Sequence, residues 1–164
     1  MEILLRSMTE NDWPSVAEIY RQGIETGNAT FETEIPAWEK WNTGHLQCCR
    51  IVATVDDSVV AWAAMSPVSG RCVYAGVAEV SVYVSGKFQG LRIGTLILDR
   101  LISESEERGI WTLQAGIFPE NKASIRLHEN LGFRVVGFRE HIGKMNGIWR
   151  NTLLLERRSK IAGI

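Results

Sequence analysis

The chain has 164 residues, a length that suits one domain burying roughly two-thirds of its unfolded surface. Its formal net charge is −1 at pH 7 and its sequence pI is near 6.3. A chain so close to neutral has no strong positive electrostatic potential to attract polyanions, so we expect no nucleic-acid partner and no membrane partner.

The cysteine content and the first residues indicate the compartment. Cys48, Cys49 and Cys72 are an odd number and the first two are adjacent, so no disulfide framework is indicated. No Cys-x-x-Cys motif is present and the three histidines are scattered, so we expect no metal site. No signal-peptide pattern and no run of about eighteen apolar residues is found. These features favour a cytoplasmic protein with reduced thiols.

The first half of the chain mixes predicted strands and helices. A strand is expected over residues 3–6, and a helix runs from Thr9 toward Ile24. The loop over 23–33 is rich in Gly, Asn and Thr and carries one exposed-looking aromatic residue, Phe31. The following elements are a helix from Pro36, a hairpin of strands over 51–55 and 59–65, and an irregular segment over 66–76.

The centre of the chain carries the pattern most suggestive of function. Residues 78–84 predict a strand, because Val80, Val82 and Val84 alternate with other residues at a period of two. Glycines then interrupt the pattern, and residues 95–107 change to the period of a helix with a broad apolar face. A helix start offers unpaired N–H groups and the positive end of a dipole. The loop before this helix is therefore a candidate seat for a phosphate or pyrophosphate.

Two common phosphate-binding loops do not fit these residues. A nucleotide-hydrolysing loop needs a lysine and a Ser or Thr directly after its last glycine, but Gly94 is followed by Thr95 and Leu96. A dinucleotide loop needs a three-glycine spacing in the first strand–helix–strand unit, whereas Gly86, Gly90 and Gly94 are four residues apart in mid-chain. The sequence therefore indicates neither nucleotide hydrolysis nor dinucleotide binding.

The second half predicts a strand over 112–117, a helix that opens at Asn121 and stops at Gly132, and strands over 133–141 and 148–155. In this helix we expect Ala123, Leu127 and Leu131 to form the buried row. A polar stripe beside the row, formed by Asn121, Ser124 and His128, is expected to face a ligand.

These elements predict the fold class. Strands outnumber helices and several of them are joined as hairpins. We therefore predict an α/β (α+β) fold, one domain over residues 1–164. Its mixed, largely antiparallel sheet of about six or seven strands is flanked by about four helices.

The loop before the central helix resembles a known signature. Gln89-Gly90-Leu91-Arg92-Ile93-Gly94 is similar to the Q/R-x-x-G-x-G/A motif of the GNAT superfamily of acetyl-CoA-dependent N-acetyltransferases. Arg92 stands where the first signature glycine is usual. Either the backbone is less close to the pyrophosphate there, or the guanidinium itself meets a phosphate.

Further segments resemble one branch of that superfamily, the phosphinothricin and methionine-sulfoximine type of amino-acid N-acetyltransferase. These segments read NATFETE, AEVSVYVS, PENKASIRLHENLGF and GKMNGIWRNTLLLERR, and the likeness spans nearly the whole chain. The resemblance implies acetyl-CoA as the co-substrate. It places pantetheine against Val82, Tyr83 and Val84, with Asn121 near this arm. It also places pyrophosphate on Gln89, Gly90, Leu91, Arg92, Ile93, Gly94 and Thr95.

Acetyl transfer to an amine needs a base, because an α-amine with a pKa of about 8 is mostly protonated at neutral pH. The family's base matches Glu79. The thioester oxygen becomes an oxyanion, which backbone N–H groups of the strand can stabilise, and we expect the group to be that of Val82. The leaving thiolate needs a proton, and the resemblance offers His128 for this role or for orienting the site, with Tyr83 as a competing donor.

An acidic acceptor calls for a guanidinium, and by matching position the resemblance assigns this role to Arg71, with Cys72, Val73 and Phe31 as further acceptor-binding residues. An acetyl-cysteine route through Cys72 is disfavoured, because nothing near it in sequence activates the thiol. The expected reaction is direct transfer to the α-amine of a small amino acid or analogue. The alternatives are acetylation of protein N-termini and an acetyl-CoA-binding module without turnover. The resemblance also implies a homodimer.

Overall fold

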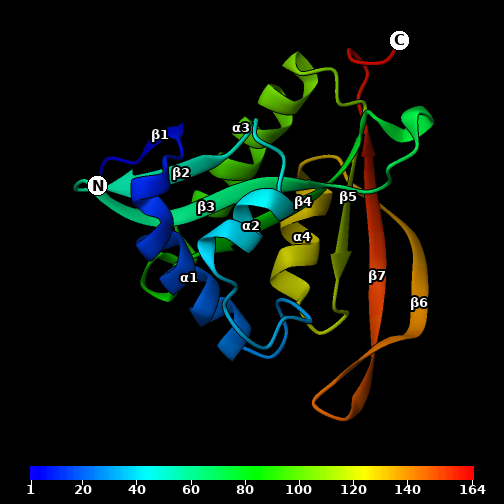
Figure 1. Ribbon diagram of the computed structural model, residues 1–164, viewed down its shortest axis with the longest axis horizontal. Coiled ribbons are helices and arrows are strands. Elements are labelled where there is room, and N and C mark those ends of the chain that lie inside the picture. The colour runs from blue at the N-terminus through cyan, green and yellow to red at the C-terminus, as the bar shows by residue number, and fades with distance from the viewer.

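Seven strands and four α-helices make up the computed structural model, which describes all 164 residues (Figure 1). The strands are β1 (Leu4–Ser7), β2 (Ile51–Val55), β3 (Ser58–Pro67), β4 (Val77–Val84), β5 (Thr112–Ile117), β6 (Arg134–Met145) and β7 (Ile148–Arg158). The α-helices are α1 (Trp13–Glu25), α2 (Trp38–Gly44), α3 (Ile93–Glu107) and α4 (Lys122–Asn130). Short 3-10 turns occur at η1 (Glu10–Asp12), η2 (Cys72–Tyr74) and η3 (Gly86–Phe88).

The strands form one sheet in the order β1-β2-β3-β4-β5-β7-β6. All neighbouring pairs are antiparallel except β4 and β5, which are parallel. The predicted fold class, a mixed and largely antiparallel sheet with four flanking helices, is therefore confirmed. None of these helices combines the length and the apolar character needed to cross a lipid bilayer.

The parallel pair is short. Its register runs only from Val77 opposite Thr112 to Glu79 opposite Gln114. Beyond Glu79, β4 stays paired with β3 as far as Val84, and β5 stays paired with β7 as far as Ile117. The sheet therefore splits between β4 and β5.

Two backbone hydrogen bonds show which neighbouring strand the N–H and C=O groups of each β4 residue face. The Ser85 N–H donates to the Val60 carbonyl at 2.8 Å, and the Thr112 N–H donates to the Gly76 carbonyl at 3.1 Å. Because backbone groups alternate sides along a strand, Val80, Val82 and Val84 turn their N–H and C=O groups toward β5. At Val82 and Val84, β5 is no longer there to meet them.

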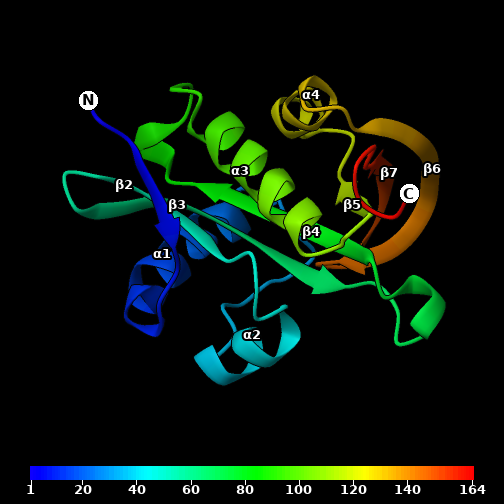
Figure 2. The ribbon, with the colours of Figure 1, turned by 90° about the horizontal axis from the view of Figure 1, so that it is seen from above.

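Helices cover both faces of the sheet, with α3 and α4 on one face and α1 and α2 on the other (Figure 2). The larger core, of 21 buried residues, lies on the α3 side, and a smaller core of seven lies on the α1 side. Strand β4 contributes to both cores. Val82 and Val84 pack on the larger core, and Tyr83 packs on the smaller one.

Two local predictions were wrong. Helix α3 begins at Ile93 and not after Gly94, because Arg92 adopts a left-handed conformation, with φ of 64°, that ends the loop earlier. In α4, Ala123 is exposed and His128 is the only buried residue. Leu127 and Leu131 of the expected row are partly buried and pack on the larger core together with Ile125, so the row was wrong only at Ala123.

Candidate active site

A crevice opens where β4 and β5 separate. Its cavity has a volume of about 1110 Å³ and lies between the end of β4, the loop before α3 and the first turns of α3 and α4. Ten of the residues predicted to hold the co-substrate line it: Val82, Tyr83, Val84, Gln89, Gly90, Arg92, Ile93, Gly94, Thr95 and Asn121. The eleventh, Leu91, is exposed and does not line the cavity.

The N-terminus of α3 has no partner inside the chain. No side chain caps it, and no acidic residue lies in its first turn. The Leu96 N–H donates to the Arg92 carbonyl at 3.1 Å and is the first to bond back along the helix. The preceding N–H groups therefore remain available in the crevice, at the positive end of the helix dipole. This arrangement suits a pyrophosphate.

Arg92 occupies a backbone conformation that favours glycine. Its left-handed φ of 64° costs a non-glycine residue roughly 1–2 kcal/mol. This conformation gives a physical reason for the glycine that is usual at this place in the signature. Arg92 lines the crevice, and its guanidinium is in none of the seven ion pairs of the chain.

A second cavity, of about 350 Å³, joins the crevice. The residues common to both walls are Ala29, Val82, Tyr83, Asn121 and Ser124. Glu79 and His128 line only the second cavity. A group carried along the crevice to this junction therefore meets a carboxylate and an imidazole on the far side.

Glu79 is the last β4 residue that pairs with β5. Its carboxylate lies over Gly116, because a Cβ added there would be 3.7 Å from Glu79 Oε1. None of the seven ion pairs of the chain includes Glu79. A half-buried carboxylate without a cationic partner can accept a proton from a ligand.

His128 is 4% exposed, and its ring meets Phe133 edge-on at 5.0 Å between centroids. Its Nδ1 lies 2.7 Å from the Ser124 carbonyl oxygen. Because a carbonyl only accepts, Nδ1 must carry the hydrogen, which leaves Nε2 of the neutral ring as an acceptor. Burial lowers the pKa of His128 below its usual 6.5, against a smaller opposing effect of the Ser124 hydrogen bond. The imidazole is therefore neutral at pH 7.

Tyr83 is held in an aromatic stack behind the crevice. Its ring centroid lies 4.8 Å from that of Trp62 and 5.0 Å from that of Tyr20, at interplanar angles of 17° and 14°. Gly23 of α1 leaves room for the ring, since a Cβ there would be 2.6 Å from it. Burial raises the pKa of Tyr83 well above its usual 10. Such a phenol is a weaker acid than a free tyrosine.

The loop that carries Phe31 is fastened to β7 and α4. Arg150 Nη1 donates to the Gly27 carbonyl at 2.8 Å, and its Nη2 donates to Asn28 Oδ1 at 2.8 Å. Asn121 caps α4 through Oδ1 and donates from Nδ2 to the Asn28 carbonyl at 3.1 Å. Phe31 then lies in the wall of the second cavity, with its ring centroid 4.9 Å from that of Phe118.

Arg71, Cys72 and Val73 are not brought to this site. They lie at η2 with exposed side chains and line neither cavity of their own chain. The guanidinium of Arg71 lies instead over the ring of Tyr74, at 5.5 Å from its centroid.

Arg139 of β6 is a residue that the sequence reasoning missed. It is the only Lys or Arg in the wall of the second cavity, and none of the seven ion pairs includes it. Arg139 pairs with Thr152, and directly opposite residues of two strands project to the same face. Thr152 is buried and also lines the cavity. No local pattern shows this placement, because it depends on pairing between two strands.

The split sheet, the uncapped helix beside it and a family match together define an acetyltransferase. Residues 13–133 match the model of the Acetyltransferase (GNAT) family, so the chain belongs to this family and is an acyltransferase. It is similar to the phosphinothricin N-acetyltransferase of Streptomyces viridochromogenes, with 31% identity over 157 residues that cover 93% of this chain and 86% of the relative.

Two solved structures have the same fold. A GNAT superfamily phosphinothricin acetyltransferase from Sinorhizobium meliloti, in complex with AcCoA, matches with a TM-score of 0.89 and 27% identity over 99% of this chain and 91% of that chain. A ribosomal-protein-alanine N-acetyltransferase from Brucella melitensis matches with a TM-score of 0.86 and 30% identity over 95% of this chain and 99% of that chain.

The packing of Phe31 against Gly143 generates a prediction. A Cβ added at Gly143 would lie 2.9 Å from the Phe31 ring, so Gly143→Ala should push the ring out of the cavity wall. We expect the KM for the amine acceptor to rise about tenfold, with the KM for acetyl-CoA unchanged in steady-state assays. Gly137→Ala on the same strand is the control, because nothing lies within 4 Å of its Cβ. An unchanged acceptor KM in Gly143→Ala would show that Phe31 does not shape the acceptor site.

Proposed function

We propose that this enzyme transfers the acetyl group of acetyl-CoA to the α-amine of a small amino acid or analogue, of the phosphinothricin, methionine sulfoximine or methionine sulfone type. The observation that carries the proposal is the junction of the two cavities at Val82 and Tyr83, with Glu79 on the acceptor side. The relative from Streptomyces viridochromogenes, named a phosphinothricin N-acetyltransferase, supports this acceptor class.

In this proposal the backbone does most of the co-substrate binding. The free N–H groups at the start of α3 hold the pyrophosphate, and Arg92 adds a cation beside it. The backbone groups of Val82 and Val84, turned toward the split, pair with the amides of the pantetheine arm. The Val82 N–H also stabilises the negative charge that develops on the thioester oxygen.

Glu79 is the proposed general base. The acceptor enters as an ammonium, and the carboxylate of Glu79 removes one proton so that the nitrogen lone pair can attack the carbonyl carbon. The absence of an ion pair leaves the lone pairs of this carboxylate free for that proton.

Glu79→Gln tests both the base and the reaction. The parent enzyme should release coenzyme A thiol with phosphinothricin or methionine sulfone and acetyl-CoA, whereas kcat of the variant should fall about 10²- to 10⁴-fold. Glu32→Gln is the control, because this exposed carboxylate lines the same cavity without a proposed proton role. Thiol release by the parent with peptides alone would instead favour the alternative that the Brucella melitensis structure suggests, acetylation of a protein N-terminus.

His128 is proposed to handle the second proton. After attack the nitrogen still carries one proton too many, and the leaving thiolate needs one. The neutral ring offers the Nε2 lone pair, so it takes this proton from nitrogen and passes it to sulfur. This role replaces Tyr83 as the donor, because the raised pKa of that buried phenol makes it a weak acid.

His128→Asn separates the proton role from a structural one. The amide of asparagine can still donate to the Ser124 carbonyl, but it has no basic nitrogen. We expect kcat of both His128→Asn and His128→Ala to fall about 10- to 100-fold, with little change in KM. Because the pKa of His128 lies below 6.5, the parent should lose activity only as pH falls below that value. Parent-like kcat in His128→Asn would leave His128 a structural role only.

Arg139 is proposed to bind the acidic or oxidised group of the acceptor. A zwitterionic acceptor needs a cation opposite the base, and Arg139 is the one cationic side chain in this cavity. Arg71 does not reach the cavity of its own chain.

In the proposed homodimer, Arg71 would act on the site of a second copy. Exposed apolar residues on the β6–β7 hairpin, such as Phe138, Ile148 and Trp149, offer a surface for that contact. We also propose that the enzyme works in the cytoplasm.

Arg139→Ala should raise the KM for an acidic acceptor about 10- to 100-fold, because a charge-assisted hydrogen bond contributes roughly 1.5–3 kcal/mol. For a simple amine without an acidic group, the same variant should show the parent's KM. Arg71→Ala measured in parallel shows whether a second copy contributes, since its effect should fade on dilution below the dimer dissociation constant. Equal acidic-acceptor KM values in Arg139→Ala and the parent would remove Arg139 from acceptor recognition.

A further inference from the structure

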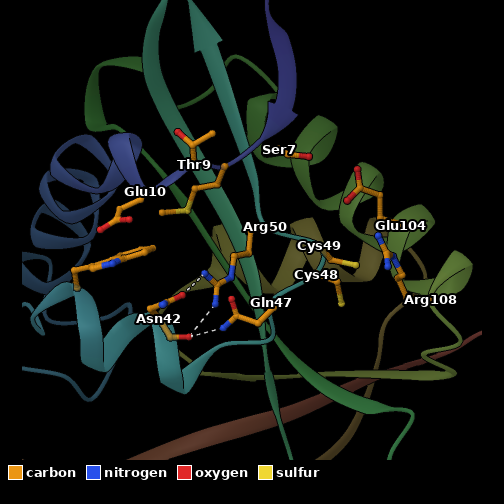
Figure 3. A pocket seen from close by; sticks show the side chains of 12 residues that line it. Ser7, Thr9, Glu10, Asn42, Gln47, Cys48, Cys49, Arg50, Glu104 and Arg108 are labelled. Carbon is orange, nitrogen blue, oxygen red and sulfur yellow. Dashed lines mark hydrogen bonds between the residues drawn. The ribbon is translucent and has the colours of Figure 1, made fainter.

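A third cavity, of about 400 Å³, lies at the opposite end of α3 from the crevice. It is bounded by the chain around η1, the segment between α2 and β2, and the last turns of α3 (Figure 3). It shares no lining residue with either cavity of the acetyl-transfer site. Two thiols, those of Cys48 and Cys49, line it, and Figure 3 shows them between Arg50 on one side and Glu104 and Arg108 on the other.

The backbone directs both thiols into this one cavity. In an extended chain, adjacent side chains point to opposite faces. Cys49 instead has a left-handed φ of 58°, which breaks the alternation. Cys49 is 7% exposed and Cys48 is half-buried, and both pack against the larger core. Burial, and then the neighbouring Cys48, raise the pKa of the Cys49 thiol to about 12.

Arg50 keeps this segment in place. Its Nε donates to the Leu46 carbonyl at 2.7 Å and its Nη2 donates to the Asn42 carbonyl at 2.9 Å. Further hydrogen bonds join Nη1 to Asn42 Oδ1 at 2.6 Å and Nη2 to the His45 carbonyl at 3.1 Å. The conformation that brings the two thiols together is therefore fixed from one side of the cavity.

The geometry of the pair restricts its chemistry. Adjacent Cα atoms are about 3.8 Å apart across a trans peptide, which is shorter than the roughly 4.4–6.8 Å that disulfides span. No peptide bond in the chain is cis. No group of three or more His, Cys, Asp or Glu side chains is arranged to hold a metal ion. A single soft atom that bonds to both sulfurs needs no S–S bond and no third ligand from the chain, and thiolates favour soft partners.

We propose that Cys48 and Cys49 form a dithiol site for a trivalent organic arsenical, whose organic group occupies the cavity. Two S–H bonds and two As–O bonds of an R–As(OH)₂ species break, two As–S bonds form, and two water molecules leave. Arsenic stays trivalent, so no oxidant or reductant is needed. Cys48, the more accessible thiol, reacts first, and Cys49 then closes the ring.

Phenylarsine oxide is the probe, and intact-protein mass spectrometry and thermal melting are the measurements. We expect one phenylarsenic group per chain, mapped to Cys48 and Cys49, which an excess of a dithiol removes and a monothiol at equal thiol concentration does not. Because the folded cavity presents both thiols, saturating probe should raise Tm by roughly 5 °C. A fall in Tm would mean that the unfolded chain binds better, which would overturn the site.

Serine variants locate the site. Cys48→Ser and Cys49→Ser should each weaken binding by at least about 100-fold, because closure of the second bond occurs at a high effective concentration. Cys72→Ser is the matched control and should bind like the parent, since Cys72 is exposed at η2. If Cys49→Ser fails to fold, Cys49→Ala and the half-buried Cys48→Ser make the same comparison. Parent-like affinity in a folded Cys48 or Cys49 variant, or labelling of Cys72 alone, would refute the proposal.

Discussion

The short β4–β5 ladder is the constraint on which the rest of the structure depends. After Glu79, β4 follows β3 and β5 follows β7, so each strand keeps one partner while losing the other. A sheet that stayed closed would satisfy the backbone of β4 internally and leave no crevice. Because it opens, a row of backbone groups faces a cavity of about 1110 Å³ instead of a neighbouring strand.

The same split sets the electrostatics of the site. Glu79 is the last residue of the ladder, so its carboxylate stands where the two halves of the sheet part and no arginine neutralises it. His128 approaches from α4, and its tautomer is set by a carbonyl of the same helix. The junction therefore holds one carboxylate that is in no ion pair and one imidazole whose Nδ1 carries the hydrogen.

Local sequence patterns predicted the parts of the structure whose causes are local. The strand over Ala78 to Val84, the loop and the helix after it follow from periodicity and glycine placement, and the structure brings nearly all of the predicted co-substrate residues into one crevice. The helix start was misplaced because Arg92 takes a conformation that periodicity does not encode. The Ala123 error has another origin, since this residue lies in the first turn of α4, in the wall of the crevice, whereas Leu127 and Leu131 of the same row pack on the core.

What the sequence did not reveal depends on contacts between distant segments. Arg139 reaches the second cavity only because β6 pairs with β7 in one register. Arg71 was assigned to the acceptor by resemblance, and in a single chain its place at η2 keeps it away. The meeting of Cys48 and Cys49 in one cavity rests on a single backbone angle, which their adjacency in sequence does not predict.

The stack of Tyr20, Tyr83 and Trp62 has a consequence for motion within the enzyme. Because Tyr83 packs against the rings of Tyr20 and Trp62 and against Gly23, a tilt of β4 would disturb the core beneath α1. The wall of the crevice that β4 forms is therefore rigid. Any adjustment to substrates of different width falls to the opposite wall, where α4 and the Phe31 loop are joined through Asn121 and Asn28 and would move as one piece.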